Sequence, residues 1–289
     1  MIKSCFYKDR PAIAVKCDIF SALFLPEDGA KLVSFKTKSD DEMLAQAKGD
    51  NYRRLGVDTS YVESECSVFD DMFPTIDPCE INGLEYSDHG EVCRREHQVK
   101  SDGDRVTFVC ELEKLNVTFK KTAFAENGAL CIKYSLENHN DFDFPYIWAG
   151  HIMLKGEKGA YVVSDFEEKS EKRVMFGKPT DLDKAHVLEG YGDNKEYKYY
   201  YTEERTPLKC SINYPESKKQ ISVEFDNDIV KYLGVWMNPG DLNGMYNLAV
   251  EPCTALYDNP VNAKKANKYS CIEACGRVEF SLKIKYMEV

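Results

Sequence analysis

Titratable side chains are concentrated in the segment DHGEVCRREH, residues 88–97, which contains two histidines, three carboxylates and two arginines. Histidine is the side chain most often used to move protons in proteins, so His89 could hold or move a proton on a bound polar substrate. Gly90 would let the backbone bend tightly beside it. The alternative is a solvated surface loop in which His89 has no chemical role.

A second histidine lies inside the apolar segment FPYIWAGHIML, residues 144–154. On a strand, Ala149 and His151 would share one face, and Trp148 and Gly150 would occupy the other. A histidine in such surroundings needs hydrogen-bond partners, or the fold loses stability. The small neighbouring residues leave space beside the imidazole, as a ligand would require. We therefore expect His151 to be either a hydrogen-bonded core histidine or part of a binding site.

A carboxylate with similar surroundings follows in GMYNLAVEPC, residues 244–253. Alternation places Asn247, Ala249 and Glu251 opposite the large apolar side chains, and Pro252 is expected to stop the strand because it lacks a backbone donor. Partial desolvation would raise the pKa of Glu251 and suit it to general-base chemistry. An exposed charge at a sheet edge is the alternative.

Aromatic and amide side chains near these groups are candidates for ligand binding. Trp148 and Trp236 each present an indole ring, which suits the apolar face of a sugar ring, and Asn238 could bond hydroxyl groups. The segment VFDDMFPTI, residues 68–76, adds Asp71. For the aromatic residues of that segment, packing in a core is the stronger interpretation.

Alternating apolar and polar residues dominate the chain and predict the elements that must position these groups. The clearest segments are RVTFVCEL, NVTFKKT, ALCIKYSLEN, QISVEF and RVEFSLKIKYM. A period of two with β-branched and aromatic residues is typical of half-buried antiparallel strands. Turn residues follow at 101–104, 125–129 and 138–143. We predict an all-β fold, either a large antiparallel β-sandwich or a barrel.

Few segments depart from this pattern. Residues 39–50, SDDEMLAQAKGD, are expected to form one short helix capped by Ser39 or Asp40. Residues 193–207, DNKEYKYYYTEERTP, are expected to form a loop or an edge strand. Because no linker rich in Pro, Gly or Ser interrupts the chain, residues 1–289 are expected to form a single domain.

Composition limits the classes of partner. The 289 residues are 43% hydrophobic, enough for a packed core, and the formal charge of −11 argues against a nucleic-acid partner. The sequence shows neither a secretion signal nor an apolar run near the ~20 residues of a membrane span. We therefore expect a cytoplasmic protein without membrane contact, whose eleven cysteines are reduced thiols. The Cys93–His97 and Cys271–Cys275 spacings do not match a zinc knuckle, so no metal is expected.

Taken in order, the motifs resemble those of the aldose 1-epimerase, or galactose mutarotase-like, superfamily. SALFLPEDGAKLVSF resembles the opening hairpin of the family, FDDMFPTI its DECFPTI-type segment, and SDHGEV its first histidine motif. YIWAGHIML resembles the second histidine strand, and LAVEPCTALYDN the strand with the catalytic glutamate. CGRVEFSLKIKYM fits the closing strands. No one motif is very specific, but their common order through most of the chain supports the resemblance.

The resemblance implies a large antiparallel β-sandwich that interconverts the α and β anomers of an aldose. It implies Glu251 as general base, His151 as general acid, and His89 as a second histidine that holds or polarises the sugar. The partner would be a small-molecule sugar, and no metal or organic cofactor would be required. Monomer and homodimer remain equally open.

Two features depart from the family pattern. The aspartate that binds sugar hydroxyls in well-studied members has three candidates here, Asp70, Asp71 and Asp241. In the hexose-6-phosphate branch an arginine follows the histidine by three residues, whereas Arg94 and Arg95 follow His89 by five and six. These arginines could bind the phosphate or carboxylate of a substrate, or lie on a solvated face. The sequence therefore leaves open whether the sugar is phosphorylated.

Two other functions fit the same scaffold. A non-catalytic carbohydrate-binding or sugar-sensing protein would keep the cleft without turnover. A glycoside hydrolase or polysaccharide lyase ranks third, because hydrolysis usually needs two carboxylates about 5–10 Å apart and only Glu251 is well placed.

Overall fold

The strands form where the alternating pattern predicts them. The computed structural model describes residues 1–54, 56, 59–63, 68–167, 169–225 and 228–289. The five alternating segments lie in β9 (Arg105–Leu112), β10 (Val117–Glu126), β11 (Ala129–Asn138), β18 (Lys219–Phe225) and β22 (Arg277–Glu288). Short turns join β8 (Gln98–Asp102) to β9 and β10 to β11, as predicted.

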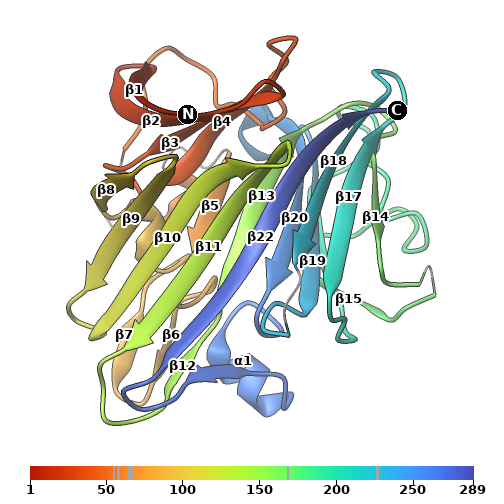
Figure 1. The fold of residues 1–289 in the computed structure, drawn as a ribbon. Coiled ribbons are helices and arrows are strands. Elements are labelled where there is room, and N and C mark those ends of the chain that lie inside the picture. Colours follow the sequence, from red (N-terminus) through yellow and green to blue (C-terminus); the bar gives the residue numbers. More distant parts are fainter. Residues whose placement is uncertain (55, 57–58, 64–67, 168, 226–227) are drawn as a thin grey trace.

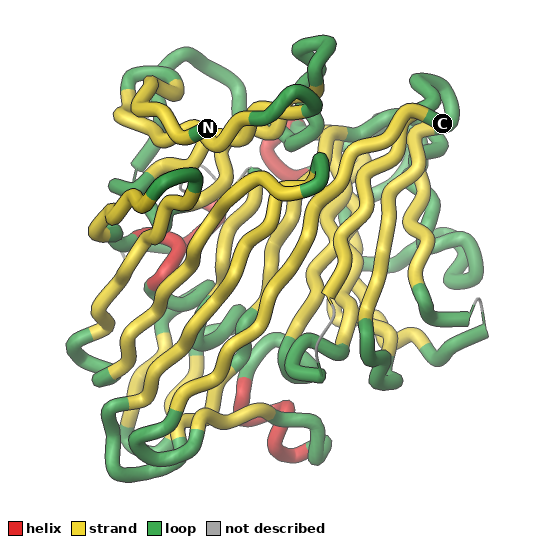
Figure 2. The backbone as a smooth tube through the Cα atoms, in the orientation of Figure 1, coloured by secondary structure: helices red, strands yellow, loops and turns green. Residues whose placement is uncertain are grey.

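Two large antiparallel sheets pack face to face (Figure 1, Figure 2). The ten-stranded sheet has the spatial order β1 (Ile2–Tyr7), β2 (Arg10–Lys16), β3 (Phe20–Leu25), β4 (Lys31–Thr37), β5 (Phe69–Met72), β13 (Ala149–Lys155), β20 (Tyr246–Cys253), β19 (Tyr232–Pro239), β16 (Tyr197–Tyr201), β15 (Lys172–Phe176). The eight-stranded sheet has the order β14 (Tyr161–Ser164), β17 (Leu208–Tyr214), β18, β22, β11, β10, β9, β8. The predicted all-β sandwich is therefore confirmed.

Smaller elements complete the described part of the chain. Two-stranded pairs form between β6 (Cys79–Ile81) and β7 (Leu84–Tyr86), and between β12 (Phe144–Tyr146) and β21 (Ser270–Ile272). The helical elements are α1 (Pro260–Lys265) and the 3₁₀ turns η1 (Tyr61–Glu63), η2 (Val92–Arg94) and η3 (Leu242–Gly244). Among the described residues, no helix is long and apolar enough to cross a membrane.

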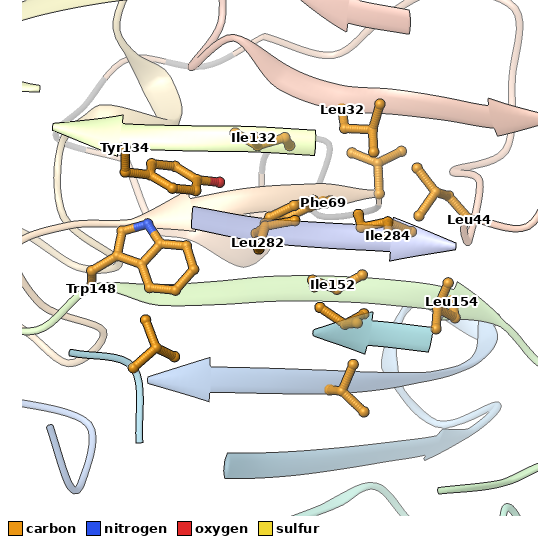
Figure 3. Close-up of a cluster of buried hydrophobic side chains, with 14 of the residues drawn as sticks. Leu32, Leu44, Phe69, Ile132, Tyr134, Trp148, Ile152, Leu154, Leu282 and Ile284 are labelled. Carbon is orange, nitrogen blue, oxygen red and sulfur yellow. The ribbon is translucent and has the colours of Figure 1, made fainter. Parts of the chain in front are cut away.

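Alternation gives the ten-stranded sheet two different faces. The inner face packs Trp148, Ile152 and Leu154 against Ile132 and Leu282 of the eight-stranded sheet (Figure 3). Each large apolar side chain buried in this way contributes about 1.5–3 kcal/mol. The outer face carries a second, smaller cluster that includes Ala149, Met153, Tyr200, Trp236, Ala249 and Cys253. Polar side chains at the alternate positions of these strands therefore lie on the outer face, which this second cluster partly covers.

Three local predictions are wrong. Residues 39–50 form no helix, because Glu42 Oε1 accepts hydrogen bonds from the backbone N–H groups of Phe35 at 2.9 Å and Leu44 at 3.1 Å. These contacts hold the segment extended, and Leu44 forms a β-bridge with Leu154. Tertiary partners thus replace the hydrogen bonds of a helix.

The second error concerns residues 193–207, since they contain β16, which lies between β19 and β15 and is therefore not an edge strand. The predicted stop at Pro252 also fails. β20 continues to Cys253 because Pro252 still pairs with Leu233 on β19, and pairing is interrupted only toward β13.

A buried ion pair joins the two sheets. Lys121 Nζ on β10 lies 2.7 Å from Asp71 Oδ2 on β5, and both side chains are at most 1% exposed. The indole Nε1 of Trp148 donates a 3.0 Å hydrogen bond to the other oxygen of Asp71. Because both carboxylate oxygens have partners, this charge is tolerated inside the core.

We predict that Lys121→Met lowers the free energy of unfolding by about 3–5 kcal/mol, because it leaves the Asp71 carboxylate buried without its cation. Adding Asp71→Asn should restore part of the loss, since the unpaired charge is then removed. Urea unfolding of both variants measures this. Lys120→Met is the matched control, because Lys120 is the preceding residue and is 40% exposed. Equal losses for Lys121→Met and Lys120→Met would contradict the assignment.

Candidate active site

His151 and Glu251 are neighbours on adjacent strands. The register of β13 with β20 pairs Ala149 with Cys253 and Ile152 with Val250, and so sets His151 opposite Glu251. Both side chains point to the outer face, away from the inner core. His151 Nε2 lies 3.3 Å from Glu251 Oε1, and the Glu251 side chain is 1% exposed. An imidazole and a carboxylate are therefore in direct contact.

Two further strands bring a cation and an indole to the same place. β19 contributes Trp236, and its register partner on β16 is Lys198. Lys198 Nζ lies 2.7 Å from Glu251 Oε2 and 2.8 Å from Asp258 Oδ1. The Trp236 indole Nε1 donates a 3.1 Å hydrogen bond to Glu196. The site is thus built from four consecutive strands of the ten-stranded sheet, β13, β20, β19 and β16.

His89 reaches the site from a strained turn. Its φ is +56°, and Gly90 follows at +68°. A Cβ on Gly90 would lie 2.0 Å from the carbonyl oxygen of Phe73, so a glycine is required there, as predicted. His89 Nδ1 is 2.7 Å from Asp88 Oδ1, and the His89 ring stacks on Tyr61 with centroids 4.2 Å apart. These contacts orient the ring, whose centroid lies 6.4 Å from that of His151.

A pocket of about 400 Å³ unites these groups. This volume lies in the ~300–1,000 Å³ range of small-molecule sites. The lining residues are Tyr61, Val62, Ile76, Asp77, His89, His151, Met153, Met175, Phe176, Glu196, Lys198, Trp236, Leu242, Glu251 and Asp258. Apolar walls with a few convergent polar groups are typical of a ligand site.

The charges at the pocket floor depend on one another. Burial opposes the charge on Glu251, but the ion pairs with Lys198 and His151 outweigh it and lower the pKa of Glu251 to about 2. The sequence-based expectation of a raised pKa is therefore wrong. Because the folded-state pKa lies below the usual value of 4.5, ionised Glu251 stabilises the fold above that pH. This contribution is lost as the pH falls toward 2.

Some buried polar atoms of the floor lack ordinary hydrogen bonds. Within the described part of the chain, Nδ1 of His151 is buried without a hydrogen-bond partner, whereas the carboxylate oxygens of Glu251 face Lys198 and His151. Buried polar atoms are usually satisfied, so such exceptions need an explanation. Hydroxyl groups of a ligand in the pocket would supply one.

Trp148 and Asp71, two predicted binding residues, lie elsewhere. Both are 0% exposed and bond to each other between the sheets. The prediction is wrong because adjacent residues on a strand face opposite sides. His151 and Ala149 are two residues apart and share the outer face, whereas Trp148 faces the inner core.

Asn238 and the candidate aspartates do not line the pocket either. Asn238 is fully buried and hydrogen-bonds to Asn247 at 3.0 Å and to the carbonyl of Leu242 at 3.1 Å. Asp70 is also fully buried and accepts a 2.6 Å hydrogen bond from the Tyr61 hydroxyl. Asp241 is exposed outside the pocket. The aspartates that do line it are Asp77 and Asp258, which the sequence interpretation missed.

Arg94 and Arg95 face away from the site. The Arg94 guanidinium donates to the backbone carbonyls of Thr59, Asp88 and Gly90, and so braces the turn that carries His89. Arg95 pairs with Glu91. Both arginines border a different cavity, so their assignment as substrate ligands of this pocket is corrected.

The other histidine of the opening segment is structural. His97 is 2% exposed, and burial lowers its pKa to about 4. It is therefore neutral near pH 7, and its ring packs edge-on against Phe119 in the core.

Lys198 is the principal residue that sequence analysis missed. It lies in the sequence YKYYY, where Tyr197, Tyr199 and Tyr201 face the inner core. Alternation of large aromatic residues in this segment is typical of a strand, but the polar residues on both sides of it favour a loop or an edge strand. Tyr61 carried no comparable signal, because it lies on a short 3₁₀ turn and not in an alternating segment.

Comparison with known proteins identifies the fold. Neither a family model nor a curated protein matches this sequence. Solved structures do match over almost the whole chain. A galactose mutarotase-like protein from Clostridium acetobutylicum has a TM-score of 0.71 and 16% identity, covering 100% of this chain and 99% of its own. A galactose mutarotase-like protein from Lactobacillus casei has a TM-score of 0.67 and 18% identity, covering 96% and 100%.

A galactose mutarotase related enzyme from Lactobacillus acidophilus is similar in the same way. Its TM-score is 0.67 and its identity 15%, with 96% of this chain and 97% of that chain covered. The chain therefore has the galactose mutarotase-like fold, in agreement with the resemblance seen in its motifs. At such low identity the likeness establishes the fold alone.

The two tryptophans provide a test of the pocket. We predict that D-galactose or D-glucose changes the fluorescence of the wild-type protein through Trp236, because only this indole lines the pocket. Trp236→Phe should abolish the change. Trp148→Phe is the matched control and should retain it, since Trp148 is buried between the sheets. A sugar-dependent change that survives in Trp236→Phe would contradict the assignment of this pocket.

Proposed function

We propose that this protein is an aldose mutarotase. The observation that carries the proposal is the 3.3 Å contact between His151 and Glu251 at the floor of a pocket of about 400 Å³. Opening a cyclic aldose requires deprotonation of the C1 hydroxyl and protonation of the ring oxygen. Both oxygens are bonded to C1, so an acid and a base in contact with each other can reach them together.

In the proposed mechanism Glu251 accepts the proton of the C1 hydroxyl, and protonated His151 donates one to the ring oxygen. The bond between C1 and the ring oxygen breaks, and the open aldehyde forms. Rotation about the C1–C2 bond presents the other face of the aldehyde. The two proton transfers then run in reverse and close the opposite anomer. Each positioned transfer contributes about 10²–10⁴-fold to the rate.

His89 and the aromatic side chains position the sugar. Asp88 and the Tyr61 ring orient His89, which then holds or polarises a substrate oxygen. Trp236 offers an indole at the same pocket for the apolar face of the ring. The lowered pKa of Glu251 keeps this base ionised at neutral pH.

We further propose that the preferred aldose is not phosphorylated. Four carboxylates line the pocket, those of Asp77, Glu196, Glu251 and Asp258. Among the described lining residues Lys198 is the one lysine, no arginine is present, and its ammonium already pairs with two carboxylates. A phosphate dianion would be repelled by this arrangement.

A carbohydrate-binding protein without turnover is the second candidate. One observation favours it: both oxygens of Glu251 face cationic or potentially cationic groups, which weakens the carboxylate as a base. A protein that binds sugar but does not accelerate equilibration of its anomers would establish this alternative.

We predict that the wild-type protein accelerates equilibration of freshly dissolved α-D-glucose or α-D-galactose, followed by polarimetry or NMR. Glu251→Gln should lower kcat at least about 100-fold because the base is removed. Glu279→Gln, an exposed change on β22 in the other sheet, is the matched control and should leave the rate unchanged. Failure of the wild-type protein to accelerate any aldose would refute the proposal.

Substrate charge can be tested separately. We predict that kcat/KM for D-glucose exceeds that for D-glucose 6-phosphate at least about tenfold, because the pocket carboxylates repel the phosphate. Raising the ionic strength should narrow the difference, since salt screens the repulsion at the exposed pocket mouth. A higher kcat/KM for the phosphorylated sugar would contradict the proposal.

A further inference from the structure

A buried lysine occupies the centre of the charged groups in the pocket. The Lys198 side chain is 6% exposed, and its Nζ touches Glu251 at 2.7 Å and Asp258 at 2.8 Å. The Tyr200 hydroxyl donates a 2.8 Å hydrogen bond to the same oxygen of Asp258. The result is a triad of one ammonium between two carboxylates.

The sheet is built so that Lys198 can reach Glu251. β16 and β20 are separated by β19, a gap of two strand spacings or about 9–10 Å. Gly234 on β19 stands opposite both Glu251 and Tyr200. A Cβ at Gly234 would lie 2.9 Å from the Tyr200 ring and 3.2 Å from Glu251 Cβ. The missing side chain therefore leaves room for the Tyr200 ring beside Glu251, and the Tyr200 hydroxyl bonds the same Asp258 oxygen as Lys198.

Asp258 is held in place from the other side. It precedes α1, and its carbonyl oxygen accepts the backbone N–H groups of Ile76 at 2.9 Å and Asp77 at 2.7 Å. The hydroxyl of Thr75 also donates to this oxygen at 3.3 Å. Lys198 is thus fixed between one carboxylate on a central strand and one on an anchored loop.

Lys198 is poorly suited to act as a nucleophile or proton donor itself. Burial disfavours its charge, but Asp258 and Glu251 outweigh this effect and raise its pKa above the ordinary value. The ammonium therefore stays protonated. A buried ion pair also adds little net stability compared with well-packed apolar side chains, so stability alone does not account for it.

We propose that Lys198 is a positioning residue, which holds Glu251 ionised and in one orientation beside His151, and that Asp258 in turn holds Lys198. This inference rests on the proposed mutarotase function of the same pocket. It assigns a role to Lys198, the side chain that this pocket contains in addition to an acid and a base.

Several groups contribute to the titration of Glu251. β19 presents Trp236 and Gly234, neither of which titrates in the relevant range. The ionisable groups that face Glu251 or share its pocket are His151 on β13, Lys198 and Tyr200 on β16, Cys253 on β20, Asp258 in the following loop, and Tyr61, Asp77, His89 and Glu196 at the wall. Lys198 is the permanent cation in this set, so its removal should have the largest effect on Glu251.

The test compares Lys198→Met with Lys198→Arg in two measurements between pH 3 and pH 8. The first is the ¹³C NMR titration of the Glu251 side-chain carboxyl, assigned as the signal missing from Glu251→Gln. The second is the pH dependence of kcat/KM. In the wild-type protein Glu251 should not titrate in this window. In Lys198→Met its midpoint should rise by at least about two pH units, and the acidic limb of the kcat/KM profile should move with it.

Lys198→Arg keeps the charge and should leave the Glu251 midpoint below pH 4. Lys198→Gln is a second neutral variant for the case that the methionine variant does not fold, because glutamine retains a polar group for Asp258. If Glu251 in the neutral variants still shows no midpoint between pH 3 and pH 8, as in the wild-type protein, the inference is overturned. Because the NMR titration needs no turnover, it decides the role of Lys198 even if the wild-type protein proves inactive. Conversely, if the wild-type protein is active but the neutral variants leave the Glu251 midpoint unshifted, the positioning role of Lys198 is refuted and the proposed function is not affected.

Discussion

The carboxylate of Glu251 is almost completely buried, and the arrangement of the pocket depends on keeping it charged. An isolated carboxylate at such a position would take up a proton, because burial favours the neutral form. Two side chains from other strands prevent this: His151 on one side and Lys198 on the other. The base, its neighbouring imidazole and the lysine therefore form one electrostatic unit, and the removal of any member changes the other two.

This unit exists because the ten-stranded sheet is covered on both faces. Its inner face packs on the eight-stranded sheet, and its outer face carries a second cluster with Tyr200, Trp236 and Ala249. Charged side chains on the outer face are therefore held in a partly dehydrated setting without being placed in the core. A second buried charge, that of Asp71, shows the contrasting case. It lies between the sheets, where Lys121 and Trp148 satisfy it.

Strand positions and the faces of individual side chains followed from local pattern. The alternation around His151 and Glu251 correctly placed both opposite the large apolar residues, and the turn at Gly90 was required sterically. Errors arose where hydrogen bonds and ion pairs of individual side chains, which the alternating pattern does not encode, determined the outcome. Glu42 holds residues 39–50 extended, and the ion pairs of Glu251 lower a pKa that burial alone would raise. The partners of Arg94 are backbone carbonyls, which residue types do not reveal, and Arg95 pairs with Glu91 four residues before it.

By itself the sequence determined the all-β class, the clearly alternating strands and the common face of His151 and Ala149, because a period of two is a local property of the backbone. Only the tertiary structure decided which strands are neighbours and in what register. That decision placed His151 opposite Glu251, put Gly234 between Glu251 and Tyr200, and brought Lys198 across β19. The physical reason is that strand pairing depends on packing between segments far apart in the chain, and a shift of one residue would turn every such side chain to the other face.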